Sequence, residues 1–461
     1  MKLYNTLTRT VEEFIPREEG KVKIYTCGPT VYSFAHVGNM RSYVSHDILD
    51  KTLRYLGYEV TRCMNITDVG HLTSDSDSGE DKMIKAMRRE NKTAMEIAKF
   101  YTDEFFKEMK VLNCRMPEIV SPATDHIEDY IEIITKLLEK GYAYINENVY
   151  FDTTKLNDYY VLTNHKEDEM VVGVREGVEE DSKKRNQNDF VLWFTSSKFE
   201  NQELQWDSPW GRGYPGWHIE CTGISIKYLG EYLDIHCGGV DNIFPHHTNE
   251  IAQSEGYLGH PWCHYWVHVE HLIDESGKIS KSKGATLTAS SLKERGYDPL
   301  AYRLMCLNSH YKKQLLFSED ILKQNEDTLN KMRNRIASIV DDNNYNEEDF
   351  NKYNDLFKEE LSDNLNTANA LTVLYDVLKS NISNKTKLEL IKSFDKVLSL
   401  DLIKEKEVSK ELEDKVNSLL ELRNKYKLEK DYDQADEVRK EIEALGATIK
   451  DTREGNIIIW N

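Results

Sequence analysis

The N-terminal part of the chain alternates β-prone runs with one amphipathic stretch. Residues 21–26 (KVKIYT) are β-prone, the Gly28-Pro29 pair interrupts them, and residues 36–56 repeat leucines at helical spacing. Residues 58–66 (YEVTRCMNI) are β-prone again. A strand, a helix and a second strand at this spacing predict a parallel β–α–β unit, and therefore an α/β fold.

Helical patterns account for most of the remaining chain. Residues 82–110 are charged and amphipathic, and residues 126–140 predict a helix that ends at Gly141. Residues 320–445 contain long Leu-, Lys-, Glu- and Asn-rich stretches with few Pro or Gly, which is typical of a helix bundle. Residues 446–461 predict a short β-hairpin that closes the chain.

Residues 190–271 differ from the rest in composition. Six of the seven tryptophans and eight of the 14 histidines lie between Trp193 and His271. Aromatic residues alone indicate a core. Histidine is also a common metal ligand and acid–base group, so the high number of histidines in this stretch indicates a metal-binding or acid–base site. The preceding polar residues 164–189 predict a solvated loop or hairpin.

Composition limits the classes of protein that fit. The chain has 461 residues, of which 39% are hydrophobic and 30% charged, so wholesale disorder is excluded. There is no apolar run of about 18 residues, and the N-terminus (MKLYNTLTRT) does not resemble a secretory signal. The seven cysteines are scattered without a CxxC pair, which predicts a reducing cytoplasm. With a net charge of −20, any nucleic acid must meet a local basic surface.

The segment CGPTVYSFAHVGN (27–39) joins the first predicted strand to the first predicted helix. A helix start presents unpaired backbone N–H groups and the positive end of its dipole, which suit phosphate. Gly38 leaves room for a flat base or ribose, and His36 could bond a phosphate oxygen. Taken alone, the same residues also fit an ordinary turn with a capped helix.

The segment ESGKISKSKG (275–284) is a basic loop between glycines. Such a loop can place ammonium groups on transferring phosphates, although a solvated basic loop is the alternative. HxGN after the first strand, followed much later by KxSKS, resembles the two-part signature of class I aminoacyl-tRNA synthetases.

A third group of residues suits a metal ion. His246 and Glu250 share one helix face, but His247 and Glu250 could share one too, so spacing does not choose between the histidines. Cys221, one histidine and Glu250 make a plausible zinc set that Cys27 would complete. A purely structural zinc, or an exposed glutamate beside core cysteines, are the alternatives.

These motifs together resemble the cysteinyl-tRNA synthetase family. CGPTVYSFAHVGN, NITDVGH, GWHIECTGISIKYLG, HCGGVDNIFPHHTNEIAQSEG and KISKSKG occur in that order, and DYDQADEVRKEIEALGATIKDT is similar to the family's C-terminal module. The resemblance implies activation of L-cysteine with ATP to cysteinyl-adenylate, followed by transfer to the 3′ end of tRNA(Cys). It also implies one Zn²⁺ per chain, Mg²⁺ accompanying ATP, and a cytoplasmic monomer.

The resemblance carries site residues onto this sequence. The family's zinc ligands match Cys27, Cys221, His246 and Glu250, and its ATP-contacting lysine matches Lys281. The other expected site residues are, for catalysis, His36 and Lys278; for ATP, Gly38, Asn39 and Ser282; and for substrate cysteine, Cys27, Thr67, Trp217, His218, His236 and His247.

A zinc ion would also explain the selection of cysteine. A free thiol has a pKa of about 8.5, and metal coordination deprotonates it at neutral pH. Serine offers a harder and poorly acidic hydroxyl. Discrimination of about 10⁴-fold would make an editing domain unnecessary, and the chain has no length left over for one.

The implied architecture is a Rossmann-like parallel-sheet catalytic domain with an insertion, then an α-helical bundle and a small C-terminal α+β module. The expected boundaries are 1–125 (catalytic domain, first half), 126–213 (connective insertion), 214–265 (second half, with zinc ligands), 266–320 (stem-contact segment with the KISKS loop), 321–410 (helical bundle) and 411–461 (anticodon-binding module). In the last of these, the candidate RNA contacts are Arg423, Lys425, Tyr426, Lys427, Lys430, Tyr432, Arg439, Lys440 and Trp460.

Two other functions share much of this pattern. A ligase that passes the same adenylate to a small amine would be expected to lack the C-terminal module. A non-catalytic, zinc-containing RNA-binding paralogue would be expected to have lost the site residues, of which Cys27, His36, His246, Glu250 and Lys281 are all present.

Overall fold

The structure is a computed structural model that divides into two units. It describes residues 1–69, 82–163, 183–195, 203–274, 277–278, 287–403, 409–452 and 455–460. One unit comprises Met1–Lys323 and Lys358–Leu371, and the other comprises Gln324–Phe357 and Thr372–Asn461. Across these residues, no helix is long and apolar enough to cross a membrane.

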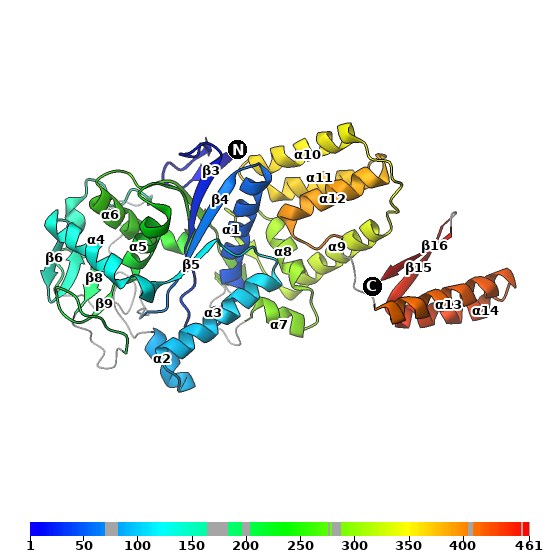
Figure 1. The fold of residues 1–461 in the computed structure, drawn as a ribbon, viewed down its shortest axis with the longest axis horizontal. Coiled ribbons are helices and arrows are strands. Elements are labelled where there is room, and N and C mark those ends of the chain that lie inside the picture. The colour runs from blue at the N-terminus through cyan, green and yellow to red at the C-terminus, as the bar shows by residue number, and fades with distance from the viewer. Residues whose placement is uncertain are drawn as a thin grey trace. The chain divides into compact units, whose positions relative to one another are not determined.

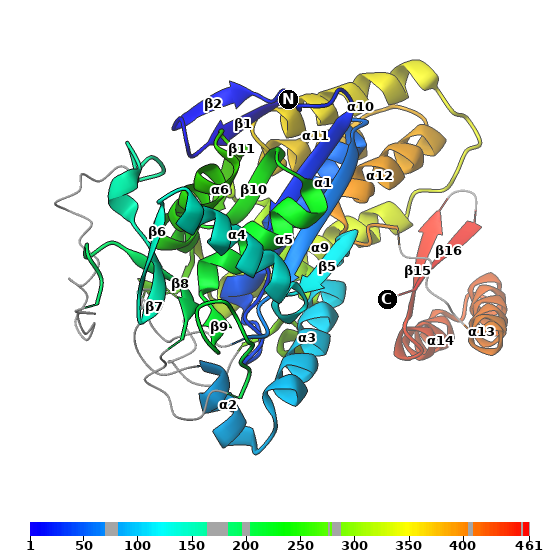
Figure 2. The same ribbon diagram turned by 60° about the vertical axis from the view of Figure 1, so that its left-hand side comes forward.

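A five-stranded parallel sheet forms the centre of the first unit (Figures 1 and 2). Its order is β11-β10-β3-β4-β5, so the direction of strand addition reverses between β3 and β10. This is the doubly wound, Rossmann-like arrangement, which binds ligands outside the carboxyl ends of the strands at the reversal. The strands are β3 (Lys21–Thr26), β4 (Glu59–Ile66), β5 (Ile119–Pro122), β10 (Leu233–Gly239) and β11 (Cys263–Val269).

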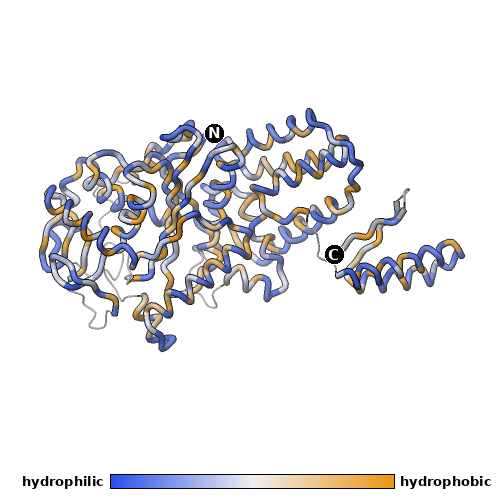
Figure 3. Tube along the Cα trace, in the orientation of Figure 1, coloured by the Kyte–Doolittle hydropathy of each residue, from blue (hydrophilic) through white to orange (hydrophobic). Residues whose placement is uncertain are grey.

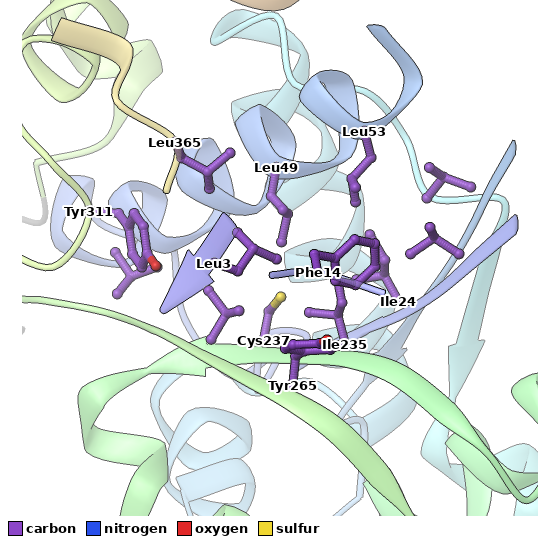
Figure 4. Packing of buried hydrophobic residues seen from close by; sticks show 14 residues of the cluster. Leu3, Phe14, Ile24, Leu49, Leu53, Ile235, Cys237, Tyr265, Tyr311 and Leu365 are labelled. Atoms are coloured by element: carbon purple, nitrogen blue, oxygen red, sulfur yellow. The ribbon is translucent and has the colours of Figure 1, made fainter. Parts of the chain in front are cut away.

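Helices cover both faces of this sheet. Successive strand residues point to opposite faces. Accordingly Ile24 packs with Leu49 and Leu53 of α1 (Val37–Tyr55), whereas Tyr25 packs with α5 (Trp217–Leu229). In Figure 4 the two leucines project from α1 toward the strands that carry Ile24 and Ile235. The predicted β–α–β unit is therefore confirmed, with α1 between β3 and β4.

The amphipathic residues 82–110 form two helices rather than one. These are α2 (Lys82–Glu90) and α3 (Ala94–Val111). Thr93 ends the break between them, because its hydroxyl accepts from the Glu96 N–H while the Glu96 carboxylate accepts from the Thr93 N–H. This reciprocal capping box starts a new helix.

An antiparallel sheet and a helix lie between β5 and β10. The helix is α4 (Ile127–Glu139), preceded by a 3-10 turn at Ala123–His126. In the polar stretch 164–189, residues 183–188 are partly or fully exposed, as predicted for a solvated loop, whereas the last residue, Asp189, is buried and accepts hydrogen bonds from Thr153 and Tyr144. Its residues 164–182 lie outside the described residues. The strands are β6 (Ala143–Asn146), β7 (Asn148–Phe151), β8 (Phe190–Phe194) and β9 (Tyr214–Pro215), with a 3-10 turn at Thr153–Lys155.

A small three-stranded sheet follows the parallel sheet in the chain and is tied to α1. Arg41 of α1 is buried, and its guanidinium donates to the backbone carbonyls of His271 and Lys313 at the edges of this sheet. The elements are β12 (Leu272–Asp274), β13 (Gly277–Lys278), β14 (Leu315–Leu316), α7 (Ala289–Glu294) and α8 (Pro299–Leu307). At the N-terminus, β1 (Lys2–Asn5) and β2 (Thr10–Glu13) form an antiparallel pair.

The rest of the chain is helical up to a terminal hairpin, as predicted. Phe357 and Phe394 stack with ring centroids 4.0 Å apart in the second unit. Figure 3 shows α13 and α14 as largely hydrophilic helices with intermittent hydrophobic positions. The elements are α9 (Glu319–Ala337), α10 (Glu347–Ser362), α11 (Thr367–Lys379), α12 (Asn384–Leu398), α13 (Lys410–Leu428), α14 (Tyr432–Ala444), β15 (Ala447–Thr452) and β16 (Gly455–Trp460).

The C-terminal helices and hairpin share one apolar core. Val416, Val438, Ile442 and Ile449 pack together in it. Arg423 does not present a free cation to RNA, contrary to expectation. Its side chain is buried and forms two hydrogen bonds with the Asp451 carboxylate, of 3.0 and 2.9 Å.

Candidate functional site

The site lies at the carboxyl edge of the parallel sheet, where the strand order reverses. Cys27 follows β3, and its N–H donates to the Cys237 carbonyl of β10 at 3.2 Å. Two glycines let the backbone pass closely here. A Cβ on Gly28 would lie 1.6 Å from the Asn65 carbonyl oxygen, and one on Gly238 would lie 2.6 Å from the His247 ring. Neither position therefore accepts a side chain.

Four predicted metal ligands meet at this edge. The ligand atoms of Cys27, Cys221, His246 and Glu250 all lie within 4.8 Å of one another. Cys221 comes from α5, and Glu250 from α6 (Thr248–Leu258). His246 comes from the kinked turn Ile243–His247, in which Phe244 has extended backbone angles, and which follows a 3-10 turn at Val240–Asn242. All but Cys27 are almost completely buried.

His246 is held on both sides of its ring. Its Nε2 lies 3.0 Å from Glu250 Oε1, and its Nδ1 lies 2.9 Å from His218 Nδ1. The Trp217 ring stacks on it with centroids 4.2 Å apart. His218 and Trp217, expected at the substrate, therefore contact one of the candidate ligands directly.

A second, overlapping set of donors shares two of these residues. The ligand atoms of Cys27, His236, His247 and Glu250 also lie within 4.8 Å of one another. His236 Nε2 is 2.8 Å from Glu250 Oε2, and His247 Nε2 is 3.2 Å from Cys27 Sγ. Geometry thus brings both neighbouring histidines to the site, as spacing alone had allowed.

Two residues that sequence reasoning missed extend this network. His247 Nδ1 lies 2.8 Å from His268 Nε2, and His268 Nδ1 lies 2.8 Å from Thr6 Oγ1. His268 belongs to the histidine-rich stretch, which identified it only as one of eight. No sequence motif surrounds Thr6, because its position beside His268 depends on the tertiary structure.

Burial controls the charge of these groups. It lowers the pKa values of His236 and His246 to about 3, so both imidazoles are neutral at pH 7. It raises the pKa values of the Cys27 and Cys221 thiols and that of Glu250, the last to about 8. Neutral imidazole is the ligand form of histidine, whereas the thiols need a metal to ionise.

The donor set fits a zinc ion. Two sulfurs, one imidazole nitrogen and one carboxylate oxygen are the ligand types that zinc prefers. Among the residues that the structure describes, the buried Glu250 Oε1 makes no hydrogen bond, although His246 Nε2 lies 3.0 Å from it. A buried carboxylate oxygen without a donor is costly unless a cation faces it.

The predicted nucleotide residues lie at the start of α1. His36 is its N-cap: its Nδ1 accepts from the Asn39 N–H, and the Asn39 side chain accepts from the His36 N–H, both at 3.2 Å. The HxGN motif is thus a capping box, with Gly38 inside the first turn. Lys278 lies in β13, whereas Lys281 and Ser282 fall outside the described residues.

Comparison with known proteins supports this picture. Residues 13–327 match the family described as tRNA synthetases class I (C) catalytic domain. The chain is 44% identical to the cysteine–tRNA ligase of Treponema denticola, with 98% of each chain covered. It is 42% identical to cysteine–tRNA ligase 1 of Burkholderia lata, with 99% of this chain and 96% of the other covered.

A solved structure shares the fold at low identity. A Mycobacterium tuberculosis methionyl-tRNA synthetase in complex with methionyl-adenylate superposes with a TM-score of 0.57. It is 15% identical, over 82% of this chain and 88% of the other. At this identity the likeness shows a common fold alone.

Proposed function

This chain belongs to the cysteine–tRNA ligase family, and we propose on that premise that Cys27, Cys221, His246 and Glu250 hold a zinc ion that selects substrate cysteine. The protein is a ligase with a class I catalytic domain, and membership of the family implies cysteine, ATP and tRNA(Cys) as its substrates. The observation that carries the zinc proposal is the meeting of four buried or half-buried donors within 4.8 Å at the strand reversal. When bound, zinc supplies a soft Lewis acid that favours a thiolate over a hydroxyl.

The choice of His246 over His247 is supported by what each ring contacts. His246 turns Nε2 to Glu250 at 3.0 Å, and His218 occupies its other nitrogen. A hydrogen bond to the second nitrogen orients a metal-binding imidazole, and both histidines have one, His246 to His218 and His247 to His268. The two rings differ in their distance from the carboxylate. His247 Nε2 lies 4.0 Å from Glu250 Oε1, compared with 3.0 Å for His246 Nε2.

In the first reaction, the carboxylate of cysteine attacks the α-phosphorus of ATP, and pyrophosphate leaves. The enzyme needs no covalent nucleophile for this, because positioning and charge stabilisation suffice. His36, Gly38 and Asn39 bind the triphosphate at the helix start, where backbone N–H groups and the helix dipole favour anions. On the pyrophosphate side, Lys278 and Lys281 neutralise the developing negative charge, and Ser282 binds the nucleotide. Mg²⁺ accompanying ATP would be held largely by the phosphates and would add to this neutralisation.

The amino acid lies beside the metal ligands. Trp217 lines the pocket for the cysteine side chain. The stacking of the Trp217 ring on His246 supports this position. His218, His236 and His247 surround it, each bonded to a candidate ligand at 2.8–3.2 Å. Thr67 contacts the amino group.

In the second reaction, a ribose hydroxyl at the 3′ end of tRNA attacks the acyl carbonyl and AMP leaves. We keep the domain boundaries given in the sequence analysis as part of the proposal. In them, residues 411–461 bind the anticodon of the tRNA. The protein is proposed to act as a monomer in the cytoplasm. Similarity to a cysteine–tRNA ligase along 98% of the chain supports a tRNA ligase rather than a ligase with a small amine acceptor.

The deciding experiment is charging of total tRNA with radiolabelled cysteine. Serine serves as the parallel substrate, and a zinc-chelated sample is run beside it. We expect charging with cysteine only, which collapses on chelation and returns with added zinc. Cysteine-dependent ATP–pyrophosphate exchange without charging would identify a different acceptor and contradict the proposal.

A further inference from the structure

The first turn of α1 has a single backbone donor left for a ligand. The N–H groups that begin a helix have no partner inside it. In α1, the His36 and Asn39 N–H groups are taken by each other's side chains at 3.2 Å. The Val37 N–H donates to the Leu287 carbonyl at 2.8 Å. Among the residues that the structure describes, the Gly38 N–H has no acceptor, and Gly38 is partly exposed.

The carbonyl of the same peptide unit is bonded to a tyrosine of α8. Tyr302 is completely buried, and its hydroxyl donates to the Val37 carbonyl at 2.6 Å. Burial raises the pKa of Tyr302 well above its usual value, so the hydroxyl keeps its proton. Within a helix this carbonyl also accepts from the N–H four residues on, and its second lone pair is available to Tyr302.

These two groups lie in one rigid plane. The Val37 carbonyl and the Gly38 N–H belong to one planar trans peptide, so they point in opposite directions. A hydrogen bond that holds the carbonyl therefore also fixes the direction of the N–H. Hydrogen bonds in a chain polarise one another, so the bond from Tyr302 also makes the Gly38 N–H a stronger donor.

We propose that Tyr302 is a positioning residue for ATP, which aims and polarises the Gly38 N–H toward a phosphate oxygen of the nucleotide. This inference rests on the proposed function, because that function brings the triphosphate to the start of α1. An anionic oxygen gains more than a neutral acceptor from such a donor and from the helix dipole. Tyr302 acts through the Val37–Gly38 peptide and makes no contact with ATP itself.

The test separates recognition of phosphate from general damage. Equilibrium dialysis of the full chain measures binding of ATP with Mg²⁺ and binding of adenosine, which has the base and ribose but no phosphate. Tyr302→Phe removes the hydroxyl and keeps the ring. We expect this variant to weaken ATP binding by about three- to fivefold and to leave adenosine binding unchanged.

A second tyrosine provides the matched control. Tyr130 of α4 is also completely buried, and its hydroxyl donates to a backbone carbonyl, that of Ala123, at 2.9 Å. Tyr130→Phe therefore loses the same kind of hydrogen bond away from α1 and should bind ATP as the unmodified protein does.

Kinetic and spectroscopic measurements detect the effect on Gly38 itself. In ATP–pyrophosphate exchange, Tyr302→Phe should raise the KM for ATP while the KM for cysteine stays the same. In NMR spectra of protein labelled at valine carbonyl carbons and glycine nitrogens, the Gly38 amide proton should shift upfield in Tyr302→Phe, because its N–H loses polarisation.

Three results would overturn the assignment. They are equal losses for ATP and adenosine in Tyr302→Phe, unchanged ATP binding in that variant, or an equal loss of ATP binding in Tyr130→Phe. A failure of the proposed function would look different, because the unmodified protein would then show no cysteine-dependent exchange while the dialysis still compares ATP with adenosine.

Discussion

At the scale of single residues, the identity of the metal ligands depends on which of two adjacent histidines binds the ion. His246 and His247 are both buried, both neutral and both near Glu250. They differ in their second partners: His246 is oriented by His218, and His247 by His268. The two overlapping donor sets therefore make different predictions for substitutions.

Zinc content should distinguish the two sets. We expect Cys221→Ser and His246→Asn to lose most of the bound zinc, because each removes a ligand of the proposed set. The matched variants His236→Asn and His247→Asn should retain about one zinc per chain. Atomic absorption on protein purified at equal zinc concentration, with circular dichroism as the control for folding, measures both. Loss from the second pair and retention by the first would assign the ion to the other set.

At the scale of elements, one ion pair joins α13 to the terminal hairpin. Arg423 is 3% exposed at its side chain and holds the half-exposed Asp451 carboxylate in two hydrogen bonds, while Lys427 lies 2.8 Å from the same group. These cations keep the pKa of Asp451 well below its usual range. Arg423, which the sequence suggested as an RNA contact, is therefore engaged by Asp451 instead.

Removing this carboxylate should loosen the module. Asp451→Asn leaves the buried Arg423 without its counter-charge and should cost about 1–2 kcal/mol after allowance for solvent screening. Hydrogen exchange measured by mass spectrometry on residues 409–452 should accelerate by about five- to thirtyfold. Glu443→Gln, in the exposed pair with Arg439, is the matched control and should change exchange little.

The pH dependence of the same region has a definite sign. Because the folded-state pKa of Asp451 is depressed, its contribution is present above the unfolded value of about 3.9. It is lost as the pH falls through the folded-state pKa. Protection should thus fall in acid for the unmodified chain more steeply than for Asp451→Asn. Parallel pH profiles would contradict the role given to this pair.

At the scale of the molecule, the described site residues all belong to one of the two units. They lie within Met1–Lys323, whereas α13, α14 and the hairpin belong to the other unit and have an apolar core of their own. Under the proposed function, activation of cysteine and reading of tRNA would therefore fall to separate parts of the chain.

Ending the chain at Ile403 should separate the two activities. We expect cysteine-dependent ATP–pyrophosphate exchange to persist, because no proposed adenylation residue is removed. Charging of tRNA(Cys) should fall at least about tenfold, as a rise in KM for tRNA. Charging at the unmodified rate would refute the assignment of residues 411–461 to the anticodon, and loss of exchange would show that the two parts depend on each other.

Sequence patterns predicted the elements well, because helix periodicity, caps and turns act over three or four residues. The strand at 21–26 and the helix near 36–56 are both found, as β3 and α1. The break at Thr93 was missed even though its capping-box residues are visible in the sequence. The family and its reaction were also readable from motif order, and the comparisons confirm both.

Contacts between distant segments were beyond such patterns. Spacing could not bring Cys27 to Cys221, since that depends on β10 adding beside β3 in the sheet. Nor could it show that Asn65 and Glu220 orient Thr67, or that Asp451 occupies Arg423. The physical reason is the same in each case: a buried polar group must be satisfied by its neighbours in space, and the packing of the sheet and helices selects those neighbours.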